Sequence, residues 1–324
     1  MKLIFSIKGD FTTTLVCKWL NFLHKPYLRI NGDSNDTQFL ELNTFDNTII
    51  FQKNNKIYDL NSANGVWYRK AGLGFKHFKA NYGIKDKEIL LEDGNELKNI
   101  VKEENRTLIK FIHKKLEKKK SVGKQYNANL NKLEVLELAK EIGLKTPKTF
   151  IATTKKQLRE ILKSENELIT KSIKDNLYHF TENHGYYTYT EKVNLDNINS
   201  FPDIFSPTLF QNLVEKRYEL RVFYLKGKFY SMCVFSQNDK QTELDFRKYN
   251  NSKPNRNIPF KLPEKIEQNL KTLFNELDLN TGSADIMVDK NGNYIFLEIN
   301  PVGQFSMVST PCNFYLEREL AKEL

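Results

Sequence analysis

The spacing of hydrophobic residues changes repeatedly along the first 70 positions. An apolar run at residues 3–7 predicts a short strand, and apolar positions three and four apart in residues 16–23 predict a helix. One of the threonines at 12–14 is expected to cap this helix, and residues 27–30 predict the next strand. This order of strand, helix and strand is typical of a βαβ unit.

More strands and a long helix follow. The patterned segments are residues 48–51, 56–60 and 65–69 as strands and about 96–118 as a helix. Asn54-Asn55 predicts a hairpin turn between the first two strands, and Asn95 is expected to cap the helix. Residues 1–120 are therefore expected to form an α/β lobe.

The next segment, about 121–210, mixes helices and strands, which predicts an α+β lobe. Asn131 with Glu134 resembles a capping box, and the helix that it opens is expected to stop at Gly143. Thr154 with Gln157 predicts the start of another helix. Strands are predicted at residues 149–152, 168–171 and 185–190.

The last segment, 211–324, begins with strand patterns and ends with a hairpin. Strands are expected at residues 209–214, 219–225 and 229–236, a helix from Pro263 to Leu277, and the hairpin over residues 283–301. Three lobes joined by short connections would suit an enzyme with a cleft.

The hairpin at residues 283–301 turns at Asn291-Gly292, a pair typical of tight hairpin turns. Its alternation predicts one apolar face, on which Ile286 opposes Leu297 and Val288 opposes Ile295. A face of this kind is expected to pack on a core.

The same register puts Asp285 directly opposite Glu298 on the other face, with Asn300 two residues further along. Opposed carboxylates repel each other, so the arrangement stabilises nothing unless a cation lies between them. Two carboxylates and a carboxamide oxygen suit Mg²⁺. The alternative is an exposed hairpin face whose acids point into water.

Composition limits the class of protein. The chain has 324 residues, of which 40% are hydrophobic and 12% aromatic, which argues against wholesale disorder. No apolar run reaches the roughly 18 residues of a membrane-spanning helix, and no signal peptide is evident, so we expect a cytoplasmic protein without a membrane partner. Three widely spaced cysteines, Cys17, Cys233 and Cys312, fit neither a disulfide framework nor a structural zinc site.

The formal charge of +10 allows a nucleic-acid binder or attraction to an acidic substrate. We expect no nucleic-acid partner, because the aromatic residues do not interleave with the lysine runs. The five histidines lack zinc-hydrolase spacing, and the sequence contains neither a G-x-S-x-G elbow nor a P-loop.

The segment from Phe296 to Pro301, with Asp285 one strand earlier, resembles the metal-binding signature of the ATP-grasp superfamily. In that family an aspartate, a glutamate and an asparagine hold the Mg²⁺ ions of ATP, which implies metal roles for Asp285, Glu298 and Asn300. The continuation Pro301-Val302-Gly303-Gln304-Phe305 resembles the graspetide, or microviridin-type, peptide maturases, most closely the grasp-with-spasm maturases. The resemblance implies a three-lobed ATP-grasp fold, with an N-terminal α/β pre-ATP-grasp lobe at 1–120, a central lobe at 121–210 and a C-terminal lobe at 211–324.

The resemblance also implies roles for residues outside the hairpin. It implies nucleotide contacts for six residues: Lys132 and Lys171 on the phosphates, Gln211, Asn212 and Val214 along the adenine edge, and Glu219 on the ribose or a metal. Arg221 would face the phosphates, and Arg247, within Asp245–Tyr249, would stabilise the transferred phosphoryl group. Glu219 and Arg221 also lie two residues apart, so a plain cross-strand ion pair is an alternative explanation.

This sequence departs from the family pattern in two places. The family's glycine-rich loop over the phosphates is not evident at residues 174–185, which hold a single glycine, so no phosphate-covering groups are assigned. Asn212 stands where the family often carries an acid.

The activity implied by the resemblance is ATP- and Mg²⁺-dependent macrocyclisation of an acid-rich precursor peptide that carries a leader segment. An Asp or Glu side chain would be activated as an acyl phosphate and joined to Thr or Ser as an ester, or to Lys as an amide. Two alternatives stay open: another ATP-grasp ligase that adds a free amino acid to a terminus or joins two small acids, and a basic nucleic-acid-binding protein. The oligomeric state is also open, with a homodimer as one candidate.

Overall fold

The computed structural model describes residues 1–78, 96–125, 129–165, 167–174, 178–181, 184–187, 190–237, 252 and 254–324. Its N-terminal part holds a parallel sheet in the order β2 (Tyr27–Asn31), β1 (Lys2–Ser6), β6 (Gly65–Tyr68) and β7 (Ser121–Val122). A second, antiparallel sheet contains β3 (Thr37–Asn43), β4 (Thr48–Lys53) and β5 (Lys56–Asp59). The helices are α1 (Phe11–Phe22) and α2 (Glu96–Glu117), with single turns η1 (Leu60–Ser62) and η2 (Phe75–His77).

The predicted βαβ unit is confirmed, because α1 joins the parallel strands β1 and β2. The predicted threonine cap is wrong. The helix begins at Phe11 with Asp10 in the extended N-cap position. Thr13 lies inside the first turn instead, where its buried hydroxyl donates to the Asp10 carboxylate at 3.0 Å. The expected cap Asn95 lies outside the described residues.

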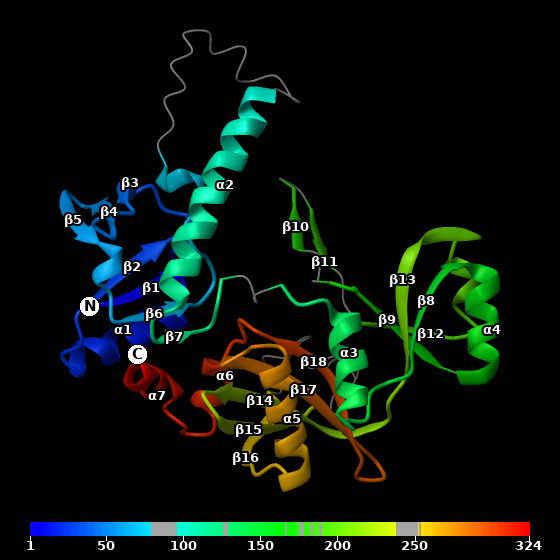
Figure 1. Ribbon diagram of the computed structural model, residues 1–324. Helices are drawn as coiled ribbons and strands as arrows, with labels where there is room; N and C mark the ends of the chain where they lie inside the picture. Colours follow the sequence, from blue (N-terminus) through cyan, green and yellow to red (C-terminus); the bar gives the residue numbers. More distant parts are fainter. Residues whose placement is uncertain are drawn as a thin grey trace.

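The middle part is a separate antiparallel sheet, on the right in Figure 1. Its order is β12 (Glu191–Val193), β9 (Leu168–Lys171), β13 (Ile204–Asn212) and β8 (Thr149–Thr154), and α4 (Lys155–Glu165) and η4 (Ile198–Ser200) pack on one face. The hairpin of β10 (Tyr178–Phe180) and β11 (Gly185–Tyr187) is paired separately. The capping box at the start of α4 is confirmed: the Thr154 hydroxyl accepts from the Gln157 amide at 3.2 Å, and Gln157 Oε1 accepts from the Thr154 amide at 3.2 Å.

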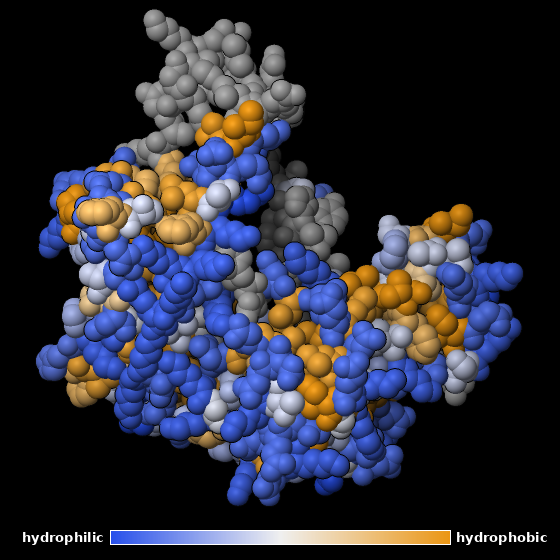
Figure 2. Space-filling view, viewed as in Figure 1, coloured by the Kyte–Doolittle hydropathy of each residue, from blue (hydrophilic) through white to orange (hydrophobic). Residues whose placement is uncertain are grey.

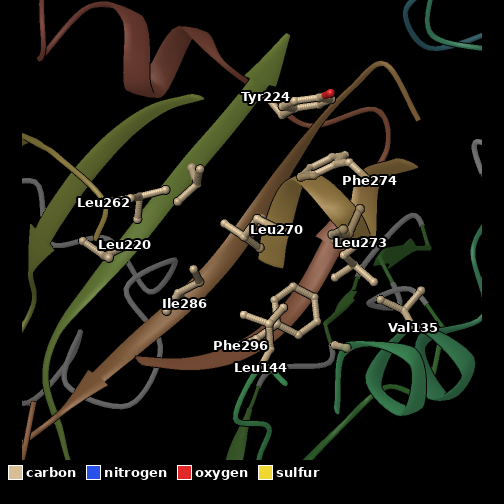
Figure 3. Close-up of a cluster of buried hydrophobic side chains, with 14 of the residues drawn as sticks. Val135, Leu144, Leu220, Tyr224, Leu262, Leu270, Leu273, Phe274, Ile286 and Phe296 are labelled. Atoms are coloured by element: carbon tan, nitrogen blue, oxygen red, sulfur yellow. The ribbon is translucent and has the colours of Figure 1, made fainter. Parts of the chain in front are cut away.

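The C-terminal sheet is antiparallel, in the order β16 (Arg256–Phe260), β15 (Lys228–Phe235), β14 (Lys216–Leu225), β17 (Thr281–Asp289) and β18 (Tyr294–Asn300). One face packs against α3 (Lys132–Glu141) and α5 (Glu264–Glu276) around Leu270, Phe274, Ile286 and Phe296 (Figure 3). The helix α3 therefore shares the core of the C-terminal sheet although it precedes the middle sheet in the chain.

Part of the opposite face of this sheet meets the N-terminal part. Phe223 and Met232 share a buried cluster with Ile4 and Trp67, and the chain's last helices, α6 (Ser306–Ser309) and α7 (Leu316–Glu323), close that cluster. Figure 1 shows α7 lying beside α1. Among the described residues, no helix is both long and apolar enough to cross a membrane.

The hairpin of β17 and β18 has the predicted turn, with Gly292 at φ +82°, but only part of the predicted register. Asp285 opposes Glu298 as expected. The pairs Ile286 with Leu297 and Val288 with Ile295 are wrong: Ile286 opposes Phe296 and Val288 opposes Tyr294, because a bulge adds one residue to β18 after Phe296. The bulge places Phe296 in the core beside Ile286, and burial of such a side chain stabilises a fold by about 1.5–3 kcal/mol.

Candidate active site

The polar face of the C-terminal sheet carries the predicted ligands. On β14 the side chains of Glu219 and Arg221 point away from the core that contains Leu220 and Val222, as the two-residue period of a strand requires. Arg221 lies opposite Asp285 on β17, and Asp285 lies opposite Glu298 on β18. Four charged side chains from three adjacent strands are thus gathered on one face.

Asp285 and Glu298 each contact a cation of the chain. Arg221 Nη1 donates to both carboxylate oxygens of Asp285, at 2.5 Å to Oδ1. Lys132 Nζ lies 3.1 Å from Glu298 Oε2. The repulsion that the sequence predicts between Asp285 and Glu298 is therefore offset by two cations of the chain itself.

Asn300 lies two residues beyond Glu298 on β18 and opposes Ser283 of β17, so it projects from the same face as the acids. Its carboxamide Oδ1 accepts a hydrogen bond from the Val302 amide at 3.1 Å. A carboxamide oxygen has two lone pairs, so one acceptor position is left after this bond.

Lys132 connects the two sheets. It is the first residue of α3. The Asn131 side chain before it accepts the Leu133 amide at 3.1 Å, so Asn131 caps the helix as predicted. The return bond of the predicted capping box differs, because Glu134 Oε1 accepts from the Asn131 side-chain Nδ2 at 2.9 Å. Lys132 Nζ reaches Glu298 on the C-terminal sheet and donates to the Ser172 carbonyl at 3.2 Å. Ser172 directly follows β9, so the predicted phosphate-binding residues Lys132 and Lys171 lie at the same end of the middle sheet.

The buried residue Glu219 has a partner that the sequence analysis did not identify. Lys216 forms an ion pair with the Glu219 carboxylate, and Ser236 Oγ donates to Glu219 Oε1 at 3.1 Å. Burial raises the pKa of Glu219, and Asp285 adds to that shift, while Lys216 opposes it. Strict strand alternation would put Lys216 and Glu219 on opposite faces, and only the irregularity between Lys216 and Tyr218 brings them together.

The middle sheet supplies the predicted nucleotide residues on the face away from α4. Leu209 pairs with Lys171, and Gln211 pairs with Ile169, whereas Phe210 between them lies in the core under α4. Lys171, Leu209, Gln211 and Ile169 therefore share the face opposite α4. Gln211 is buried and donates from Nε2 to Thr149 Oγ1 at 2.9 Å.

Asn212 and Val214 lie where β13 passes into β14. The Asn212 side chain accepts the Lys148 amide at 2.7 Å, so it fastens the start of β8. Val214 is half-buried in the short connection to the C-terminal sheet. The segment that holds these two residues links the two sheets.

Buried polar atoms without a hydrogen-bond partner occur on both sheets. Within the described part of the chain these atoms include Arg221 Nε and Ser283 Oγ on the C-terminal sheet and Gln211 Oε1 on the middle sheet. Unsatisfied buried atoms are costly, and a bound ligand is one means of satisfying them. Two of the three belong to residues for which the sequence predicts nucleotide or phosphate contacts.

Two sequence predictions fall outside the described residues. Arg247 and the rest of its motif lie between residues 238 and 251. Part of the segment 174–185, which stands where the family carries its glycine-rich loop, lies in the undescribed stretches 175–177 and 182–183. Among the described residues, no group of three or more His, Cys, Asp and Glu side chains is spaced to hold a metal. The predicted metal ligands are two acids and one amide, so the third ligand is Asn300, which is not an acid, a histidine or a cysteine.

Figure 2 shows hydrophobic surface where α3 meets the middle sheet. Ile151, which pairs with Leu209 on the face of that sheet opposite α4, is 44% exposed. An apolar surface beside a charged cluster is the usual composition of a small-molecule site.

No protein-family model and no curated protein matches this sequence. Solved structures do match it. The macrocyclase MdnC from Microcystis aeruginosa, bound with the precursor peptide MdnA, superposes with a TM-score of 0.78 at 22% identity, over 99% of this chain and 98% of that chain. A RiPP-associated ATP-grasp ligase from Chryseobacterium gregarium, in complex with ADP and a leader and core peptide, gives a TM-score of 0.78 at 22% identity, over 99% and 94% of the two chains.

A more distant match is D-alanyl-alanine synthetase A from Vibrio cholerae, with a TM-score of 0.51 at 14% identity, over 93% of this chain and 88% of that chain. The chain therefore has the ATP-grasp fold, as the hairpin motif predicted.

Proposed function

We propose that this protein is an ATP-dependent ligase that macrocyclises a precursor peptide by activating Asp or Glu side chains. A peptide carboxylate attacks the γ-phosphate of ATP, ADP leaves, and an acyl phosphate forms. A Thr or Ser hydroxyl, or a Lys amine, of the same peptide then attacks the acyl carbon and releases phosphate. ATP hydrolysis offsets the unfavourable formation of an ester or amide from a free acid in water.

The donor set on the C-terminal hairpin fits magnesium. Asp285, Glu298 and Asn300 present oxygen atoms from one face of adjacent strands, and Mg²⁺ prefers a few carboxylate ligands together with phosphate oxygens and water. When bound, the metal would withdraw charge from the transferred phosphoryl group. Arg221 and Lys132, which contact Asp285 and Glu298, would pair with phosphate oxygens when those acids hold the metal.

The nucleotide would lie between the face of the middle sheet opposite α4 and the polar face of the C-terminal sheet. Lys132 and Lys171 would contact its phosphates, and Gln211, Asn212 and Val214 its adenine edge. The unpartnered Gln211 Oε1 supports an adenine contact, because it is an acceptor and the adenine amino group is a donor. Glu219 would face the ribose or a metal, and Arg221, with Arg247, would stabilise the developing charge.

Three finer statements belong to the same proposal. The lobes are taken as residues 1–120, 121–210 and 211–324. The peptide is acid-rich and carries a leader, in keeping with the charge of +10, which would speed the encounter with an acidic partner. We also place the reaction in the cytoplasm and leave a homodimer as the candidate assembly.

The observation that carries the proposal is the opposed pair Asp285 and Glu298, with Asn300 on the same face, in a chain with the ATP-grasp fold. The peptide substrate is supported by the two matched enzymes whose solved structures contain precursor peptides. The test is to incubate the protein with Mg-ATP and an acid-rich peptide encoded beside it, and to weigh the peptide. Loss of the mass of one water per ring, together with formation of ADP, is the expected result.

Two outcomes would favour other activities. ADP formation only after addition of a free amino acid, with the peptide gaining a residue, would indicate a terminus-modifying ligase. Tight salt-dependent binding to DNA or RNA with no ATP turnover would indicate the nucleic-acid-binding alternative. A protein that binds neither ATP nor Mg-ADP would contradict the proposal outright.

A further inference from the structure

A buried arginine of the N-terminal lobe contacts the loop that follows the hairpin. Arg69 comes directly after β6 and is 3% exposed. Its Nη1 donates to the Val302 carbonyl at 2.6 Å and to the Gly303 carbonyl at 3.0 Å. Its guanidinium carbon also lies 5.5 Å from the centre of the buried Phe305 ring. One side chain thus holds three residues of this loop.

The charge of Arg69 is balanced by Asp10, the N-cap of α1. Arg69 Nε lies 3.3 Å from Asp10 Oδ2. The same carboxylate oxygen accepts hydrogen bonds from Thr13 Oγ1 at 3.0 Å and from Ser6 Oγ at 3.4 Å. A buried charge is costly unless it is paired and hydrogen-bonded, so Asp10 and its two hydroxyl donors keep the guanidinium in place.

The loop held by Arg69 in turn orients Asn300. The Val302 amide donates to Asn300 Oδ1 at 3.1 Å, and the Gly303 amide donates to the Asn300 carbonyl at 3.0 Å. The carbonyl of Val302 accepts from Arg69, and its amide donates to Asn300, so the Val302 residue is fixed on both sides. The packing is also tight at Gly303, where an added Cβ would lie 2.0 Å from Ser283 Oγ.

We propose that Arg69 is a positioning residue for the metal site: through Val302 it sets the orientation of the Asn300 carboxamide, and Asp10 holds Arg69 for that purpose. The inference rests on the proposed function, because it takes Asn300 as a metal ligand. Groups that hydrogen-bond to metal ligands typically change metal affinity 10–100-fold when removed. Arg69 acts on Asn300 through Val302 and does not bond to it directly. We therefore expect metal affinity to change about tenfold, at the lower end of that range.

The test measures metal binding, with Mn²⁺ as the probe, titrated into protein saturated with ADP. Arg69→Lys keeps the charge, but a single ammonium cannot reproduce the planar set of guanidinium donors. We expect the Mn²⁺ dissociation constant to rise about tenfold. A smaller rise is expected for Asp10→Asn, because that substitution leaves the bonds from Arg69 to the Val302 and Gly303 carbonyls in place. ADP binding measured without metal is expected to stay unchanged.

A matched control separates positioning from plain destabilisation. Val16 lies in the cluster that joins the N-terminal and C-terminal parts, and Val16→Ala removes packing there without removing a group that holds the loop. We expect it to lower the melting temperature, as Arg69→Lys does, and to leave Mn²⁺ affinity within twofold of the wild type. Arg69→Lys and Val16→Ala with equal effects on Mn²⁺ affinity would overturn the proposal.

A double-mutant cycle tests the route through Asn300. If Arg69 acts by orienting that side chain, Arg69→Lys should cause no further loss of Mn²⁺ affinity in an Asn300→Ala background. Full additivity of the two losses would overturn the inference and leave the proposed function standing. Failure of the wild-type protein to bind Mn²⁺ and ADP at all would overturn both.

Discussion

Lys132 Nζ lies 3.1 Å from Glu298 Oε2, and this contact joins the first residue of α3 to the last strand of the C-terminal sheet. The same ammonium donates to Ser172, at the end of β9 in the middle sheet. The two sheets that would enclose a nucleotide are thus linked through one cation. Its position depends on the packing of α3 and on the cap at Asn131.

The variant Glu298→Gln should abolish ATP turnover and leave the fold intact. The substitution keeps the shape of the side chain but removes the charge of one proposed metal ligand. Mutation of a residue that hydrogen-bonds to a metal ligand typically lowers metal affinity by roughly 10–100-fold. Because Glu298 is itself a proposed ligand, we expect a larger loss of metal affinity here. Stability should change by less than about 1 kcal/mol, because the pair with Lys132 is partly exposed.

Turnover of ATP and the circular dichroism spectrum check that prediction. Glu276→Gln is a matched control, because Glu276 is an exposed glutamate at the end of α5. Normal turnover by Glu298→Gln would show that the metal assignment is wrong.

Asn131→Ala should destabilise the protein by about 1 kcal/mol, the usual cost of losing an N-cap acceptor. The Asn131 side chain accepts the Leu133 amide, and no methyl group can replace that acceptor. Urea unfolding measures the change. Asn131→Asp keeps an acceptor oxygen and should stay close to the wild type; equal destabilisation by both substitutions would contradict the cap's role.

Stability should fall on acidification because of His113. Burial lowers the pKa of His113 from 6.5 to about 3, with a smaller contribution from His77. The neutral ring accepts the Leu73 amide at Nε2, at 2.9 Å. Between these two pKa values the unfolded chain binds a proton that the folded chain does not, so stability decreases as the pH falls through that window.

We expect the proton uptake by His113 on unfolding to lower the free energy of unfolding by about 1.4 kcal/mol between pH 7.5 and pH 5.5. The lower pH lies about one unit below the unfolded pKa, and one pH unit corresponds to about 1.4 kcal/mol. Urea unfolding at the two pH values, for the wild type and for His113→Gln, isolates it from the carboxylates. The variant should lose less stability than the wild type over this range. Identical pH dependence of the two proteins would contradict the lowered pKa, because it would mean that His113 takes up its proton equally in the folded and unfolded chains.

Gly303→Ala should destabilise the loop after Asn300 by about 1–3 kcal/mol, the usual cost of overpacking. The added Cβ would lie 2.0 Å from Ser283 Oγ and 2.8 Å from the Ser283 backbone nitrogen, so a rotamer change of Ser283 cannot relieve the clash. Gly74→Ala is the control, since its Cβ would meet only the Gly32 carbonyl, at 3.8 Å. Thermal unfolding should separate the two; an unperturbed Gly303→Ala would contradict the close packing of this loop on β17.

Features that depend on neighbouring residues were predictable from the sequence. The cap at Asn131, the capping box of Thr154 and Gln157, and the hairpin turn at Gly292 each arise from groups a few residues apart. Alternation along residues 281–300 similarly indicated which acids share a face. The predicted opposition of Asp285 and Glu298 is observed, but it holds only because the bulge after Phe296 shifts the register by one residue.

Other features depend on residues far apart in the chain. The bulge that pairs Ile286 with Phe296 follows from what the core under α5 can accommodate, and the irregularity in β14 brings Lys216 to Glu219. Arg69 and the Val302 carbonyl that it holds are 233 residues apart. No local pattern encodes such contacts, because their free energy comes from burial and charge pairing that exist only once the lobes have packed together.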